Sequence, residues 1–200
     1  MDAGNGHLLQ RHGPWLAPET VRLRVGELRD PAIVRTELRL PGADAYARHT
    51  HACGTEATWF TDQVALAACF VTCVEHPRVR RRLDQPFDPA RTPSPTRIPL
   101  DEALGPDGHL HIDGYRLAAA GADQDRARRE RDAWVHRAMR RPAEAGPPPE
   151  VVRISDFAGG AVLVAFRPDA ERRRYEIATM YGVPPRPPYV RGTAATARPA

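Results

Sequence analysis

The chain contains no lysine, because all 29 of its basic residues are arginine. Without lysine it can form neither a P-loop, whose lysine reaches the nucleotide phosphates, nor a Schiff base with pyridoxal or a carbonyl substrate. Asparagine occurs only at Asn5, whereas alanine, arginine and proline are frequent. The frequent residues have GC-rich codons, so we discount any motif that consists of arginine alone.

Serine, cysteine and long apolar runs are also scarce. The two serines are Ser94, in a proline-rich stretch, and Ser155, which lacks the Gly-x-Ser-x-Gly elbow of a hydrolase. Cys53 lies near His49 and His51, but no third group that would orient such a thiolate pair is evident. We therefore predict that the protein is not an enzyme and binds no cofactor.

The N-terminal segment has no apolar signal sequence, so we expect no secretion. In a chain that is not secreted, we expect the three cysteines to be reduced thiols rather than disulfides. No apolar run approaches the ~20 residues that a membrane-spanning helix needs. We therefore expect no membrane span.

The segment most suited to burial is residues 61–83. Between Val64 and Val74 every residue except Thr72 is Ala, Val, Leu, Phe or Cys, and a helix that is apolar nearly all round is typical of a protein interior. Asp62 is a suitable N-cap, and Pro77 ends the helix because it pushes the preceding residue out of helical geometry.

Pro77 is also suited to the first position of a second, short helix. Val79 and Leu83 would face inward there, and four arginines would form the surface: Arg78, Arg80, Arg81 and Arg82.

The remaining chain alternates between strand patterns and one long helix. Alternating apolar residues predict strands at residues 20–28, 34–40, 151–157, 161–167 and 174–181. Asp113-Gly114 predicts a hairpin turn within residues 109–118. Residues 123–141 predict an amphipathic helix with Asp123 as its N-cap and a thin apolar stripe that includes Trp134.

Together these elements predict an α+β fold in which a mostly antiparallel sheet of six or seven strands packs on the buried central helix and the arginine-rich amphipathic helix. We expect a flexible N-terminal arm (1–18) and a single domain (19–182). This domain would contain a proline-rich loop (85–99) and a linker (142–149). The proline-rich tail (183–200) has too few apolar residues for a packed core and is predicted to be disordered.

Histidines and cysteines suggest one candidate zinc site. Cys69 and Cys73 share a helix face, His76 follows three residues later, and Cys53 with His49 and His51 could complete a tetrahedral set. The spacing matches no common zinc finger, and reduced cysteine also packs as a small buried hydrophobe. Metal binding at Cys53, Cys69, Cys73 and His76 is therefore the weaker interpretation.

Two groups of arginines are candidates for nucleic-acid binding. The first is Arg78 to Arg82, and the second lies on the long helix: Arg126, Arg128, Arg129, Arg131, Arg137, Arg140 and Arg141. They could form one basic face, or they could be solvated and paired internally, as Asp125 and Arg129 would be at i,i+4. Aromatic residues for base stacking are not interleaved. Residues 184–189, PPRPPY, could form a polyproline II ligand.

Several short motifs occur in an order that resembles a known family. They are Val34-Arg35, Thr50-x-x-Cys53, His76-Pro77-x-Val79-x-x-x-Leu83, Ile112-x-Gly114, Trp134, and Val151-Val152-x-Ile154. This series resembles a small tegument and nuclear-matrix accessory protein of alphaherpesviruses, encoded near the right-hand end of the unique long region. The chain continues past Ile154. Its end carries Ala158-Gly159, then Tyr175-x-x-Ala178-Thr179-x-Tyr181-Gly182, then Pro184. This end resembles another small alphaherpesvirus nuclear protein from the left end of that region.

Both resemblances imply a non-enzymatic viral accessory protein, found in the host nucleus and the virion tegument, that binds viral or host proteins. Neither family supplies a catalytic or binding residue to transfer. Two alternatives stay open: an arginine-rich nucleic-acid-binding module, and a small actinobacterial cytoplasmic domain with a Cys/His zinc site.

Overall fold

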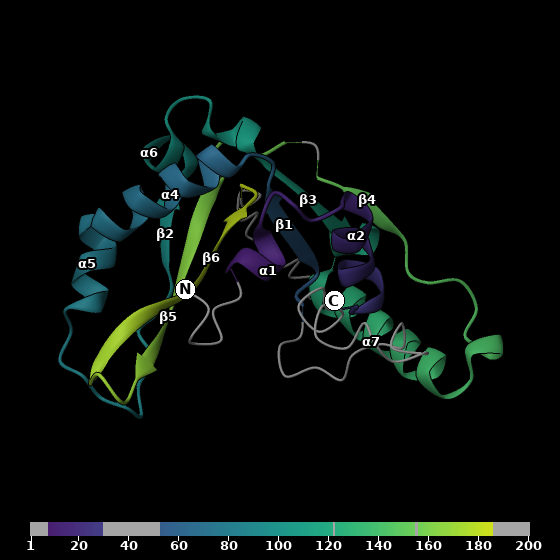
Figure 1. Cartoon of the computed structure of the whole chain (residues 1–200). Coiled ribbons are helices and arrows are strands. Elements are labelled where there is room, and N and C mark those ends of the chain that lie inside the picture. Colours follow the sequence, from purple (N-terminus) through teal and green to yellow (C-terminus); the bar gives the residue numbers. More distant parts are fainter. Residues whose placement is uncertain (1–7, 30–52, 122, 155, 186–200) are drawn as a thin grey trace, which may run out of the picture.

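The computed structural model describes residues 8–29, 53–121, 123–154 and 156–185. Over these ranges the chain has an α+β fold with two three-stranded antiparallel sheets (Figure 1). One sheet has the order β1 (Glu56–Phe60), β3 (Ile112–Leu117), β4 (Val151–Arg153), and the other has the order β2 (Thr96–Pro99), β5 (Ala161–Asp169), β6 (Arg174–Val183). The prediction of a single sheet with six or seven strands was wrong.

The two sheets meet where β1 approaches β6. The Thr58 hydroxyl donates to the Gly182 carbonyl oxygen at 2.5 Å, and both groups are buried. A Cβ on Gly182 would lie 2.5 Å from Cγ2 of Ile112, so this glycine lets β6 pass close to β3. The two sheets are therefore connected by a side-chain hydrogen bond and by close packing. In one continuous sheet, backbone–backbone hydrogen bonds would connect β1 to β6 instead.

The helices lie around these sheets. They are α1 (Leu8–His12), α2 (Pro18–Glu27), α4 (Gln63–Glu75), α5 (Pro77–Leu83), α6 (Leu100–Leu104) and α7 (Gln124–Arg140), with short 3-10 helices at Gly108–His111, Ala118–Gly121 and Pro142–Glu144. Figure 1 shows α4 and α5 beside the sheet of β2, β5 and β6, and α2 and α7 beside the other sheet.

The core consists of two apolar clusters. The first joins α4 and α5 to β5 and β6 through residues such as Cys69, Val79 and Met180, and it also includes Phe60 of β1 and Ile112 of β3. The second joins α2 and α7 to β1 and β3; its members include Val21, Val25, Trp59, Leu117 and Trp134. The helices predicted from capping and proline positions, α4, α5 and α7, are confirmed, as are the strands β5 and β6.

Residues 20–27 of the predicted strand 20–28 lie in helix α2 instead. Pro18 occupies the first turn, where its missing N–H has no cost, and Glu19 pairs with Arg22 at 2.6 Å in an i,i+3 arrangement. Val21 and Val25 are buried at i,i+4 spacing. The two valines fit a strand face and a helix face equally well, and the proline and the ion pair favour the helix.

Asp113-Gly114 lies inside β3 and not in a hairpin turn. A Cβ on Gly114 would lie 2.9 Å from the Thr58 methyl group and 3.1 Å from Ile154, so the glycine here permits close packing between strands. Asp113 forms a bidentate ion pair with Arg153 on the neighbouring strand β4. The predicted hairpin was therefore wrong.

Other predicted boundaries change more modestly. The proline-rich loop ends at residue 95, because residues 96–99 form β2. Strand β4 covers only Val151–Arg153 of the predicted 151–157. Part of the predicted arm forms α1, in which Leu8 and His12 are buried. The predicted strand at 34–40, and the tail from residue 186 onward, lie outside the described residues.

Candidate protein-interaction surface

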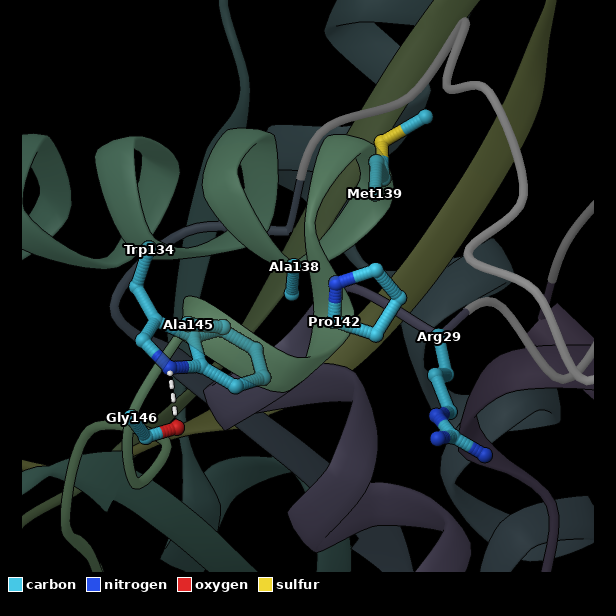
Figure 2. Close-up of a pocket in the computed structure, with 7 residues that line it drawn as sticks. All are labelled: Arg29, Trp134, Ala138, Met139, Pro142, Ala145 and Gly146. Atoms are coloured by element: carbon cyan, nitrogen blue, oxygen red, sulfur yellow. Dashed lines mark hydrogen bonds between the residues drawn. The ribbon is translucent and has the colours of Figure 1, made fainter.

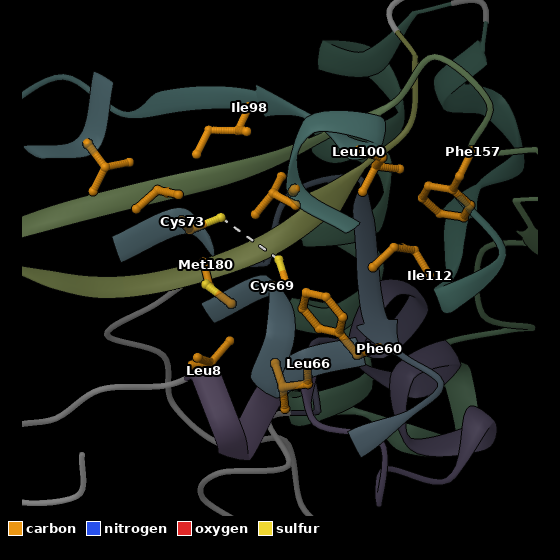
Figure 3. Close-up of a cluster of buried hydrophobic side chains, with 14 of the residues drawn as sticks. Leu8, Phe60, Leu66, Cys69, Cys73, Ile98, Leu100, Ile112, Phe157 and Met180 are labelled. Carbon is orange, nitrogen blue, oxygen red and sulfur yellow. Dashed lines mark hydrogen bonds between the residues drawn. The ribbon is translucent and has the colours of Figure 1, made fainter. Parts of the chain in front are cut away.

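Helix α4 buries one side against the first apolar cluster. The Asp62 carboxylate caps its start by accepting from the backbone N–H groups of Val64 and Ala65, at 2.6 and 3.3 Å. Leu66, Cys69 and Cys73 then point inward, and Figure 3 shows them among core side chains that include Leu8 and Met180. The buried side fixes the orientation of the helix on the protein.

The opposite side of α4 is exposed although it is apolar. Val64 is 76% exposed and Val71 is 62% exposed, and Ala67 and Ala68 between them are also exposed. The spacing i, i+3, i+4, i+7 places these four residues on one helix face, which we name the α4 face. The sequence predicted a helix buried on all sides. That prediction was wrong, because the core covers only one side of the helix.

Helix α5 extends this surface with positive charge. His76 joins the helices: its Nδ1 accepts from the Arg78 backbone N–H at 3.2 Å, and its Nε2 lies 3.1 Å from a carboxylate oxygen of Glu102. Arg80 pairs with Glu75 at 2.7 Å. For Arg81 and Arg82, no carboxylate in the described ranges lies within salt-bridge distance. The α4 face is thus followed by arginines that are available to a partner.

Several arginines in α7 and directly after it form ion pairs within the protein. Arg126 pairs with Glu130, Arg128 with Asp132, and Arg141 with Glu144. Exposed arginines without an acidic partner in the described part of the chain are Arg129, Arg137 and Arg140. Helices α5 and α7 lie at opposite ends of the molecule in Figure 1. The predicted single basic face is therefore not formed.

Arg131 has a structural position that the sequence did not indicate. Its side chain is fully buried and donates to the backbone carbonyl oxygens of Val25, Gly54 and Cys53 at 3.3, 2.5 and 3.1 Å. Its guanidinium also pairs with the carboxylate of Asp132 at 2.9 Å. Arg131 thus joins α7 to the end of α2 and the segment before β1, and it cannot contact a phosphate.

The proposed zinc ligands do not converge. Cys69 and Cys73 belong to the first apolar cluster, whereas Cys53 belongs to the second. No group of three or more His, Cys, Asp or Glu side chains within residues 8–29, 53–121, 123–154 and 156–185 is arranged to hold a metal. His49 and His51 lie outside these ranges. Among the described candidates, therefore, no zinc site is assembled.

Cys69 and Cys73 instead form a thiol pair in the core. Their sulfur atoms are 3.8 Å apart, and both residues are completely buried. The hydrogen bond with Cys73 and burial both raise the pKa of the Cys69 thiol. Cys69 therefore stays protonated near neutral pH, as expected for a packing residue rather than a nucleophile.

A hollow lies at the C-terminal end of α7. It is a pocket of about 390 Å³ lined by Arg29, Trp134, Ala138, Met139, Pro142, Ala145 and Gly146 (Figure 2). The Trp134 indole N–H donates to the Gly146 carbonyl oxygen at 3.1 Å, which fixes the ring in the wall. The thin apolar stripe of α7 was predicted to face the core, but the sequence did not indicate that its last turn borders a hollow.

The comparisons with known proteins do not extend these observations. No family model, no curated protein and no solved structure matches this chain. Within the described ranges, no helix is both long enough and apolar enough to cross a bilayer.

Proposed function

We propose that this protein is a non-enzymatic accessory protein that acts through protein–protein interaction, and that the α4 face is a surface it uses for this purpose. The observation that carries the proposal is the exposure of Val64 and Val71, 76% and 62%, on one face of a well-capped helix. Exposed apolar residues that gather on one face are typical of interaction sites, whereas single ones are ordinary.

The energetics favour a partner on this face. Complete burial of a valine side chain contributes about 1.5 to 3 kcal/mol relative to its exposure. Valine is also stiff at χ1, so it loses little rotamer freedom when a partner covers it. The core already holds α4 in place through Leu66, Cys69 and Cys73. The face is thus presented on a rigid support and needs no ordering before it binds.

The resemblance to alphaherpesvirus proteins extends this proposal to a biological setting. We propose viral or host nuclear proteins as partners, and the host nucleus, its matrix and the virion tegument as locations. Fractionation of infected cells and purified virions tests this setting: the protein should be recovered in the nuclear fraction and in virions. Recovery from an actinobacterial cytosol instead would contradict it.

Nucleic-acid binding has less support. Its motif, a set of arginines, is divided between α5 and α7, and several of these arginines are paired within the protein. Phosphate contacts make affinity fall steeply with salt. Retention of the protein on DNA or RNA that decreases strongly between about 50 and 200 mM salt would favour this alternative.

Site-specific photo-crosslinking tests the interaction surface. A benzophenone amino acid replaces Val71 on the α4 face, and a matched variant carries it at Ala133, an exposed position on α7. We expect a discrete protein adduct from the variant at position 71 and none from the variant at position 133. Equal labelling at both positions, or no adduct at position 71, would contradict the proposal.

A further inference from the structure

We infer that the partner on the α4 face is a second copy of this chain, paired through α4 in an antiparallel arrangement about a two-fold axis. This inference rests on the proposed function, because it names the partner of the same surface. The first argument is the pattern of the face itself: valine, alanine, alanine and valine at positions 64, 67, 68 and 71. This pattern reads the same in both directions about the midpoint between Ala67 and Ala68.

A two-fold axis at that midpoint makes the face self-complementary. Val64 of one copy meets Val71 of the other, and Ala67 meets Ala68, as an isologous interface requires. The small alanines lie at the crossing point, where helix axes can approach to about 8 Å. The valines on either side then fill the grooves of the opposite helix. A partner of unrelated sequence would gain nothing from this symmetry.

Charge supports the antiparallel direction. At the C-terminal end of α4 the carboxylate of Glu75 is paired with Arg80. The helix then leads into α5, where Arg81 and Arg82 have no acidic partner among the described residues. The N-terminal end carries the Asp62 carboxylate, which is 44% exposed. Antiparallel pairing brings the positive end of one copy toward the negative end of the other, and it also opposes the two helix dipoles favourably. Parallel pairing would place like charges together.

The area of the surface sets the strength of the pair. Leu110, which is 65% exposed, adds apolar surface near the start of α4, because the adjacent His111 lies 4.0 Å from Asp62. Even so, the α4 face spans little more than two helical turns. The area that it can bury is therefore smaller than the ~800 Å² per partner of stable interfaces. We therefore expect a weak, concentration-dependent dimer, with a dissociation constant on the order of 10 to 100 µM.

Sedimentation equilibrium on the full chain tests the association. From about 1 to 300 µM protein, the mass should rise from the 22.1 kDa of one chain toward twice that value. Val64→Asp and Val71→Asp should each abolish the rise, because they bury a carboxylate in the pair. The matched control is Met139→Asp, which changes an exposed apolar residue on α7 and should leave the rise unchanged.

A disulfide test examines the geometry. Val64→Cys and Val71→Cys variants are prepared separately, and the native cysteines do not interfere because they are buried. In the antiparallel pair, position 64 faces position 71 of the other copy, whereas identical positions are about 10 Å apart along the helix. Oxidation should therefore give a covalent dimer in a mixture of the two variants but not in either variant alone.

Three results would overturn the inference: a single-chain mass at every concentration, a dimer that both aspartate variants retain, or equal crosslinking in the unmixed samples. The photo-crosslink at position 71 separates these results from the proposed function. An adduct with a different protein, from a chain that is monomeric alone, would overturn self-association and leave the interaction proposal standing. The absence of any adduct would contradict both.

Discussion

The Arg131 guanidinium donates to the carbonyl oxygen of Gly54 at 2.5 Å, from a side chain that has no exposed surface. The two residues are 77 positions apart, so this bond closes a long loop of chain. Further bonds to the carbonyl oxygens of Val25, in the last turn of α2, and of Cys53, before β1, hold the same guanidinium between these two segments. One buried arginine therefore links three segments of the second apolar cluster.

Replacement of this residue should be strongly destabilising. We expect Arg131→Met to lower the free energy of unfolding by about 3 kcal/mol or more, because three backbone carbonyl oxygens, two of them in buried hydrogen bonds, lose their donor. Urea denaturation followed by circular dichroism measures this loss. Arg129→Met is the matched control, since Arg129 is exposed on the same helix; its effect should stay within about 0.5 kcal/mol. Equal effects of the two substitutions would contradict the assigned role.

Arg131 also shows what the sequence could not reveal. Seven arginines lie within residues 123–141, and nothing local distinguishes the buried one from its neighbours. Its burial depends on carbonyl oxygens supplied by segments more than 70 residues away. By contrast, the start of α7 was predictable, because Asp123 caps it locally by accepting from the Arg126 backbone N–H at 2.9 Å.

The joint between α4 and α5 gives a second prediction. His76→Ala should cost about 1 kcal/mol of stability, because the Arg78 backbone N–H loses its acceptor at the start of α5. His76→Asn should recover most of this loss, since asparagine is a good N-cap. Glu102→Gln serves as the control for the exposed contact to Nε2 and should have little effect. If His76→Asn were as destabilising as His76→Ala, the capping role would be wrong.

Close packing between the sheets gives a third prediction. Gly182→Ala should destabilise the protein by about 1 to 3 kcal/mol, because the added Cβ would lie 2.5 Å from Cγ2 of Ile112 in a filled core. Gly121→Ala is the matched control: its Cβ would meet no atom within 4 Å. The control should be neutral or slightly stabilising, since alanine restricts the unfolded chain. Thermal unfolding of both variants distinguishes steric overlap from a general cost of removing glycine.

The errors in the predicted fold share a physical origin. Val21 and Val25 fit both a period of two and a period of 3.6, so the local pattern did not separate strand from helix. Gly114 was interpreted as a turn residue, but it is needed because Thr58 and Ile154 approach from other segments. The exposure of Val64 and Val71 was equally unpredictable, because both sides of α4 are apolar and only the packed structure shows which side the core covers.

Glu56 gives a prediction about pH. Burial at the start of β1 raises the pKa of its carboxyl above the ordinary value of 4.5, and the nearby Arg116 offsets only part of this shift. Since the folded state binds this proton more tightly, the stabilisation is fully present below pH 4.5 and is lost as pH rises through the folded-state pKa. Ionised Glu56 therefore destabilises the fold at neutral pH.

Glu56→Gln removes the ionisation and keeps the shape of the side chain. The variant should be more stable than the natural chain at pH 7, and the difference should shrink toward zero as pH falls to about 4. Urea denaturation at a series of pH values measures this difference, with Glu171→Gln as an exposed control that should show no such trend. A Glu56→Gln variant that is less stable at pH 7 would mean that the attraction of Arg116 exceeds the cost of burying the charge. The carboxylate would then be a favourable cross-strand partner in the β1–β3 register, where Glu56 lies opposite Arg116.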